Sequence, residues 1–266
     1  EGFPSLPQVQ YEKRKLRYED VYPVLYLKYR LETQQEDSGV RHLIVDEMQD
    51  YSMIQYLIIQ RLFKCRMTIL GDREQTMDGE QQDVLTFLPK IFGKDIRRIV
   101  MNKSYRNTVE IASYANKLAG ITEVELFERH GKPVVEKEFP GLEEALESVV
   151  RELRLEKQAA EEIISYETAA VIARTADEAR EAYYILKEKL EAEGFDTKER
   201  LSLLHRDSTN FQKGLTVTTF YMAKGLEFDQ VFSVFPGEDR SPIVERARYI
   251  AATRALHELY MYEVMK

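Results

Sequence analysis

The sequence predicts an α/β fold in which parallel sheets are flanked by helices and two domains follow one another. Short apolar strands alternate with amphipathic helices, an order typical of parallel sheets. The 266 residues suffice for two domains that each bury a core. With 44% hydrophobic and 32% charged residues, the composition is that of an ordinary globular protein.

The first alternation lies in the N-terminal third. His42 to Val45 and Met67 to Leu70 are apolar enough to form buried strands. Between them, apolar residues recur at helical spacing on one face. These residues are Ile54, Leu57, Ile58 and Leu62. The segment is therefore predicted to form a β-α-β unit.

A second, longer alternation follows. Its strand candidates are Ile96 to Met101, Ala169 to Ala173, Leu215 to Thr219, Val231 to Phe235 and Leu259 to Tyr262. Its helix candidates are Val109 to Leu118, Leu142 to Leu155, Asp177 to Glu193 and Ile243 to Leu256. Asn107-Thr108 offers an N-cap for the first helix, and Gly194 stops the third. We place the domain boundary near Asn102, which gives a partial domain at 1–102 and a complete one at 103–266.

Composition limits the classes of function. The net charge of -8 excludes general coating of nucleic acid, so any such contact must be local. Cys65 is the only cysteine, which excludes a disulfide framework and favours a reducing cytoplasm. No apolar run approaches the roughly 20 residues that span a bilayer, and no signal-like N-terminus is present. Because the chain begins at Glu1 without Met, we expect it to be part of something longer.

The first chemical signal is Asp46-Glu47, directly after a predicted strand. Ligands of open parallel sheets bind outside the carboxyl ends of the strands. An Asp there can hold Mg²⁺ through oxygen, and a neighbouring Glu can orient and deprotonate an attacking water. An acidic strand-to-turn junction without a catalytic role is an equally common explanation of the pair alone.

The next strand ends in Leu70-Gly71-Asp72, and Gln75 follows shortly after. Gly71 permits a tight exit from the strand. Gln75 could reach a γ-phosphate or its attacking water, as amide side chains do in other nucleotide hydrolases. Taken alone, the Gly-Asp pair is better explained as a simple turn.

Two arginines of the second domain are candidates for neutralising a transferred phosphoryl group. Arg106 follows Ser104-Tyr105, and Arg254 closes the run Ile250 to Ala255. Guanidinium forks bind phosphate oxygens, so arginines from a second domain are what an ATP site between domains requires. Either arginine alone is more often part of a surface ion pair.

The most specific run is Thr216 to Asp229, which joins a β-branched strand to a turn containing Lys224-Gly225 and places Glu227 where it can face a ribose hydroxyl. With this run the chain resembles the UvrD/Rep/PcrA-like helicases of superfamily 1, which have two RecA-like domains of P-loop NTPase architecture. Five segments carry the resemblance in order. They are Val45 to Asp50 (motif II), Gly71 to Gln75 (motif III), Ser104 to Thr108 (motif IV), Thr216 to Asp229 (motif V) and Arg248-Tyr249 with Thr253 to Ala255 (motif VI).

The resemblance implies an ATP-dependent DNA helicase that uses ATP and Mg²⁺ and binds single-stranded DNA. It also implies a role for each matched residue. Asp46 would hold Mg²⁺, Glu47 would be the general base, and Gln75 would sense the γ-phosphate. Arg106 and Arg254 would be the arginine fingers, Glu227 would contact the sugar, and Gly225 would let the backbone approach the nucleotide closely. The residues that would couple the nucleotide site to the single strand are Thr219, Tyr221 and Lys224.

Departures from the family limit what this chain is expected to do. No G-x-x-x-x-G-K-[ST] phosphate loop occurs in the sequence. In the family that loop lies upstream of motif II, so we expect the chain alone to lack ATPase activity. Thr76-Met77-Asp78-Gly79 stands where the family carries a base-stacking aromatic residue. Tyr221 replaces the histidine usual in motif V, and either stacks on a base or is buried with a satisfied hydroxyl.

The spacing between motifs is also short. Only 118 positions separate Arg106 from Lys224, which leaves no room for the large insertion of UvrD and PcrA. This feature and the wording of motifs II and V are similar to the HelD, or helicase IV-like, branch. Some members of that branch bind and recycle RNA polymerase. An ATP-driven remodeller of RNA polymerase is therefore the alternative to a DNA translocase.

Overall fold

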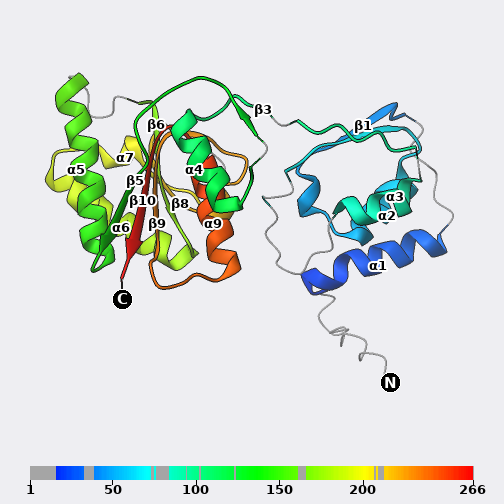
Figure 1. Cartoon of the computed structure of the whole chain (residues 1–266). Helices are drawn as coiled ribbons and strands as arrows, with labels where there is room; N and C mark the ends of the chain where they lie inside the picture. The colour runs from blue at the N-terminus through cyan, green and yellow to red at the C-terminus, as the bar shows by residue number, and fades with distance from the viewer. Residues whose placement is uncertain are drawn as a thin grey trace. The chain divides into compact units, whose positions relative to one another are not determined.

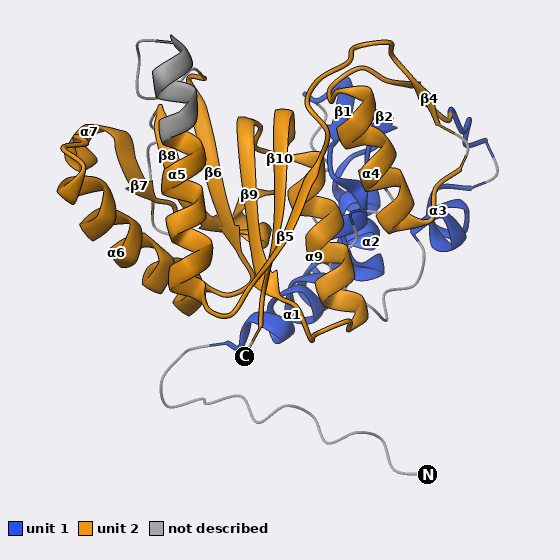
Figure 2. Cartoon of the chain, turned by 60° about the vertical axis from the view of Figure 1, so that its left-hand side comes forward, with its two compact units in different colours: residues 1–99 blue, residues 100–266 orange. Residues whose placement is uncertain are grey.

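The computed structural model describes residues 16–32, 39–72, 75, 84–93, 95–101, 103–122, 124–160, 166–206, 208 and 213–265. The chain divides into two compact units, Glu1–Ile99 and Val100–Lys266 (Figure 2). The division falls three residues before the boundary expected from the sequence. No helix in the described ranges is long and apolar enough to cross a bilayer.

Unit 1 is built around a small parallel sheet. Its elements are α1 (Tyr18–Leu31), β1 (His42–Val45), the 3-10 helix η2 (Met48–Asp50), α2 (Met53–Leu62), β2 (Arg66–Ile69) and α3 (Val84–Phe92). β1 and β2 pair in parallel register from His42↔Arg66 to Val45↔Ile69, which confirms the predicted β-α-β unit. Val45 packs with Tyr56 of α2 and Phe87 of α3 in the core of the unit.

Three features of unit 1 differ from the sequence prediction. The strand expected at Ile96 to Met101 is wrong, because residues 95–101 form no strand and are exposed. β-branched residues favour strands only where a neighbouring strand supplies hydrogen bonds and a surface to pack on. The helices α1 and α3 were not predicted, and each contains a proline, Pro23 and Pro89, of the kind that argues against a helix interior.

Unit 2 contains one large parallel sheet (Figure 1). Its strands are β5 (Val135–Phe139), β6 (Thr168–Ala173), β7 (Leu201–Leu203), β8 (Gly214–Thr219), β9 (Phe228–Pro236) and β10 (Ala255–Val264), in the order β5-β10-β9-β6-β8-β7. Its helices are α4 (Val109–Ala119), α5 (Leu142–Ala160), α6 (Ala176–Ala192), α7 (Thr197–Arg200), α8 (Phe220–Ala223) and α9 (Pro242–Thr253). The short parallel pair β3 (Lys103–Ser104) and β4 (Glu125–Leu126) completes the unit. These elements confirm the α/β fold class.

Helices cover both faces of the six-stranded sheet, with α5 and α6 on one side and α4 and α9 on the other (Figure 2). Successive strand residues point to opposite faces. On β6, for example, Val171 belongs to the core beneath α5 and α6, whereas Ile172 points to the opposite face. Because both faces are buried, the central strands read as continuous apolar runs, which explains why the sequence located them.

One helix boundary and one additional strand in unit 2 differ from the prediction. The last helix ends at Thr253 rather than Leu256, because Ala255 already pairs with Phe228 as the start of β10. β5 was not predicted, since its sequence Val-Glu-Lys-Glu-Phe is mostly charged. β5 lies at the edge of the sheet, where charged side chains remain in water.

The parallel strands give the sheet of unit 2 an amino edge and a carboxyl edge. Residues that directly precede strands lie at the amino edge of the sheet, and residues that directly follow strands lie at the carboxyl edge. Glu227 precedes β9 and Arg254 precedes β10, so both lie at the amino edge. Thr219, the last residue of β8, lies at the carboxyl edge.

Candidate active site

The acidic residues of unit 1 follow β1 at the carboxyl end of the small sheet. Asp46 is exposed, and its Oδ1 accepts a hydrogen bond of 2.8 Å from the backbone N–H of Glu47. Glu47 has φ +52 and ψ 52, in the left-handed region, and it is the only non-glycine residue with positive φ among those described. This conformation is costly for a side chain with a Cβ, and such strain is concentrated at functional sites.

A residue that sequence reasoning did not single out, Gln49, holds the side chain of Glu47 in place. Gln49 is 2% exposed, and its Nε2 donates to Oε2 of Glu47 at 2.5 Å. Its Oε1 accepts from the backbone N–H of Asp72 at 3.1 Å. The side chain therefore links the loop after β1 to the loop after β2. In the sequence, the signal for this role was an amide residue placed between the acidic residues Glu47 and Asp50.

The loop after β2 is held close to the loop after β1. A Cβ on Gly71 would lie 2.4 Å from Oε1 of Gln49 and 2.6 Å from the backbone N of Met48, so glycine is required by proximity. The backbone N–H of Met48 donates to Leu70 O at 2.8 Å. Tyr56 donates its hydroxyl to Met48 O at 3.0 Å, and burial raises the pKa of Tyr56, which keeps this donor protonated.

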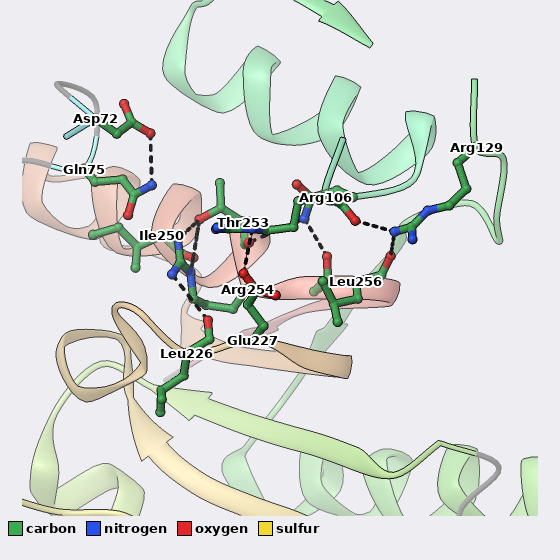
Figure 3. Close-up of polar contacts among 12 residues, drawn as sticks. Asp72, Gln75, Arg106, Arg129, Leu226, Glu227, Ile250, Thr253, Arg254 and Leu256 are labelled. Carbon is green, nitrogen blue, oxygen red and sulfur yellow. Dashed lines mark hydrogen bonds and ion pairs between the residues drawn. The ribbon is translucent and has the colours of Figure 1, made fainter. Parts of the chain in front are cut away.

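Gln75 completes the polar set of unit 1. Its side chain is buried, and its Nε2 donates to Oδ2 of Asp72 at 2.9 Å (Figure 3). Its backbone N–H also donates to Asp72 O at 3.2 Å, a hydrogen bond that the alternative explanation of a simple turn likewise accounts for. Asp46, Glu47 and Gln75 are thus connected through Gln49 and Asp72. Thr76 to Gly79, which stand where the family carries an aromatic residue, lie outside the described residues.

The basic candidates of unit 2 gather at the amino edge of its sheet. Arg254 is 2% exposed and donates through Nη1 to Leu226 O and through Nε to Ile250 O, both at 3.3 Å (Figure 3). Its Nη2 donates to Oγ1 of Thr253 at 3.0 Å. The surface ion pair that was the alternative for this residue is therefore wrong. Arg254 is a buried group that joins the end of α9 to the turn before β9.

Arg106, by contrast, does form a surface ion pair. Its Nε lies 2.7 Å from Oε1 of Glu227, and the two side chains are 47% and 41% exposed. The neighbouring Asn107 donates through Nδ2 to Ala255 O at 2.6 Å, which brings the Arg106 segment beside the start of β10. Thr108 caps α4 by accepting from the backbone N–H of Ile111, as predicted. The structure thus brings Arg106, Glu227 and Arg254 together.

The Thr216 to Asp229 run connects the two edges of the sheet. Thr219 is buried at the carboxyl edge and caps α8, accepting from the backbone N–H of Met222 at 3.3 Å. Tyr221 is 64% exposed, so the alternative of a buried tyrosine is wrong. Lys224 directly follows α8, and Gly225 then adopts φ +80 with open space where a Cβ would lie. The predicted coupling residues therefore come first in this short segment, and the predicted nucleotide residues Gly225 and Glu227 follow directly after Lys224.

The donor chemistry of unit 1 fits a magnesium ion that arrives with a nucleotide. Within the described ranges, no group of three or more Asp, Glu, His or Cys side chains could hold a metal. Mg²⁺ is commonly bound by one or two carboxylates together with substrate phosphates and water, and it does not need a protein cage. The exposed carboxylate of Asp46 matches that requirement.

Residues 16–77 match the UvrD/REP helicase N-terminal domain. The matched range contains Asp46, Glu47 and Gln75, so this part of the chain is helicase-like. The basic residues of unit 2 lie outside it. No curated protein matches the chain.

The solved structures that are similar to the chain include two helicases or helicase domains. The C-terminal domain of a possible DNA helicase from Lactobacillus plantarum WCFS1 has 24% sequence identity and a TM-score of 0.45, and the similarity covers 60% of this chain and 88% of that one. The PRRSV helicase has 15% identity and a TM-score of 0.42, with 83% of this chain and 34% of that chain covered.

Proposed function

We propose that this chain carries the metal, base, sensor and arginine residues of an ATP-dependent superfamily 1 DNA helicase or translocase. The observation that carries the proposal is the connected set of Asp46, Glu47 and Gln75 inside the segment that matches the helicase family. The cluster of Arg106, Glu227 and Arg254 in unit 2 supplies the second half of the chemistry.

Each acidic or amide side chain has a role in hydrolysing the γ-phosphate of ATP. Asp46 would hold Mg²⁺, which when bound neutralises phosphate charge. Glu47, oriented by Gln49, would accept a proton from the attacking water. Gln75 would position that water or contact the γ-phosphate.

The arginines would stabilise the charge that develops on the transferred group. Arg106 is available for this because its pair with Glu227 is exposed, and exposed pairs are worth only about 0–1 kcal/mol. A phosphate can therefore replace the carboxylate at small cost, which leaves Glu227 free for a ribose hydroxyl. Arg254 is already oriented by the carbonyls of Leu226 and Ile250.

The chain by itself is proposed to be inactive as an ATPase. Successive N–H groups of a phosphate loop and its Lys are needed to wrap the phosphates, and no such loop occurs in the 266 residues. The proposal therefore requires a phosphate loop supplied by sequence upstream of Glu1. Coding sequence upstream that lacks such a loop contradicts the motor proposal.

The test is ATP hydrolysis by a protein extended upstream to include the phosphate loop, measured with and without single-stranded DNA. Strong stimulation by single-stranded DNA supports the helicase or translocase. The 266-residue chain, assayed in parallel, should show no turnover. Turnover of the extended protein that does not respond to DNA, with RNA polymerase co-purifying, favours the second candidate.

That second candidate is a HelD-like, ATP-driven factor that remodels RNA polymerase. Two observations favour it: only 118 positions separate Arg106 from Lys224, and Thr76 to Gly79 contain no aromatic residue. Stacking on an aromatic side chain contributes about 1–3 kcal/mol per base, so its absence weakens the grip on a single strand. The exposed Tyr221 is the side chain that could compensate.

A further inference from the structure

Arg129, which belongs to none of the five motif segments, connects the two segments that carry the candidate arginine fingers. Arg129 follows β4 in the chain. Its Nη2 donates to the backbone carbonyl of Arg106 and, at 2.8 Å, to that of Leu256 (Figure 3). Leu256 is the second residue of β10 and lies two positions after Arg254. One guanidinium nitrogen therefore bridges the backbone next to both candidate fingers.

Asn107 reinforces this bridge from the other side. Its Nδ2 donates to Ala255 O at 2.6 Å and to Thr253 O at 3.4 Å. Arg129 and Asn107 together attach the loop that carries Arg106 to the backbone on both sides of Arg254. Residues 105–108 form no strand, so no strand-to-strand backbone hydrogen bonds attach this loop to β10. The side chains of Arg129 and Asn107 make the attachment instead.

The segment that carries Arg129 is itself anchored to the start of α4. Arg129 O accepts from the backbone N–H of Val109 at 2.9 Å. Gly131 donates its N–H to Oε2 of Glu110 at 2.9 Å, and a Cβ on Gly131 would lie 2.6 Å from Cγ2 of Thr108. The guanidinium is thus held by a backbone that cannot easily shift.

The position of Arg129 also has a cost. Its Nε is buried and has no hydrogen-bond acceptor among the residues that the structure describes. A buried N–H without an acceptor destabilises the fold, and a hydrocarbon side chain would avoid that cost. The two hydrogen bonds that Nη2 donates to backbone carbonyls stabilise the same side chain and offset this cost.

We infer that Arg129 is a positioning residue for the Arg106 finger, which it holds at a fixed place relative to Arg254. The inference rests on the proposed function, since it assumes that Arg106 acts on a phosphoryl group. Displacement of a catalytic group by about 1 Å can lower a rate by about 100-fold. Loss of the bridge should therefore lower kcat without removing any group that contacts substrate.

The test uses the extended protein that contains a phosphate loop and measures kcat and KM for ATP. Arg129→Met should lower kcat by about 10-fold to 100-fold and change KM less. Arg129→Lys, which keeps a donor for the carbonyls, should recover most of kcat. The matched control is Arg180→Met, which removes an exposed arginine paired with Asp177 within α6 and should change nothing.

A double-mutant cycle with Arg106→Gln separates positioning from a general structural defect. If Arg129 acts through Arg106, Arg129→Met should cost little further in the Arg106→Gln background, whereas a structural defect adds its full cost there. An additive result overturns the inference. So does a loss of kcat that only follows a loss of folded protein in circular dichroism.

The same series distinguishes failure of the inference from failure of the proposed function. If Arg106→Gln lowers kcat and Arg129→Met does not, only the positioning role is overturned. If neither substitution lowers kcat, Arg106 is not a finger, and the proposed function fails at that residue. Should Arg129→Met fail to fold, Asn107→Leu removes the bridge from the other side and should give the same non-additive loss with Arg106→Gln.

Discussion

The acidic site of unit 1 and the basic site of unit 2 are built by different means. Glu47 adopts an unfavourable backbone conformation and is held by the side-chain amide of Gln49. Arg254 is buried, and its donors contact two backbone carbonyls and the hydroxyl of Thr253. The acidic site therefore depends on strain and one buried amide, whereas the basic site depends on a buried arginine held by the end of α9 and the turn before β9. Substitutions should affect the two sites differently.

The largest effect on stability is expected at Arg254. Arg254→Met removes a donor of Leu226 O and one of the donors of Ile250 O, which also accepts from Oγ1 of Thr253. We expect the free energy of unfolding to fall by about 2–3 kcal/mol, the upper part of the usual cost of leaving a buried polar group unpaired. Urea unfolding followed by circular dichroism measures this change. A loss similar to that of an exposed arginine would remove the difference between the two sites.

The next largest effect tests the close contact between the two loops of unit 1. Gly71→Ala places a Cβ against the backbone of Met48 and the amide of Gln49. We expect a loss of about 1–3 kcal/mol, the usual cost of overpacking. Gly141→Ala is the matched control, because its Cβ meets only the flexible carboxylate of Glu144. Equal stability of the two variants in urea unfolding would contradict the described loop contact.

The strain at Glu47 can be measured by comparing two substitutions. Both Glu47→Gly and Glu47→Ala remove the side chain that accepts from Gln49, but only glycine relieves the positive φ. We expect the Gly variant to be more stable than the Ala variant by about 1–2 kcal/mol, the cost of the left-handed region for a residue with a Cβ. Thermal unfolding of both variants provides the measurement. If the Ala variant is the more stable one, the backbone at Glu47 is not strained.

A smaller effect is expected for the exposed pair of Arg106 and Glu227. Glu227→Gln should change the free energy of unfolding by less than about 1 kcal/mol, because both side chains are nearly half exposed. The same variant should raise KM for ATP in the extended protein, since the proposed sugar contact is weakened. A large loss of stability would mean that the pair is structural and not available to a nucleotide.

The smallest effect concerns pH and the anchor of the Arg129 segment. A hydrogen bond from His130, together with backbone donors, lowers the pKa of Glu110 from 4.5 to about 2. Because the folded pKa is depressed, the stabilisation is present above pH 4.5 and is lost as pH falls toward 2. Glu110→Gln should therefore be less stable than the original chain near pH 6 and nearly equal to it near pH 2. Melting temperatures at several pH values test this, and a constant difference would contradict it.

The sequence predicted those parts of the fold whose residues are buried on both sides or follow a helical period. β6, β8, β9 and α4 belong to this class. It did not predict β5, whose charged residues suit an edge strand, and it placed a strand at 96–101, where no described neighbour supplies a ladder. Pairing between strands is a long-range property that local pattern cannot contain.

The candidate site was predictable where chemistry is local in sequence. Asp46, Glu47 and Gln75 each directly follow a strand or its turn, so their residue types carried the signal. Gln49 and Arg129 were not found because their roles depend on backbone groups far away in the sequence. Glu227 lies near Arg254 because the residues that follow them, Phe228 and Ala255, pair in neighbouring strands, and Asn107 attaches the Arg106 segment to Ala255.

The central claim is that the two sites serve one ATP hydrolysis reaction. The most direct measurement is kcat for ATP in the extended protein, with Glu47→Gln and Arg254→Lys examined separately. Each variant should lose about 100-fold or more, because one lacks the base and the other the fork that binds phosphate. Hydrolysis that continues at the original rate in both folded variants would contradict the account.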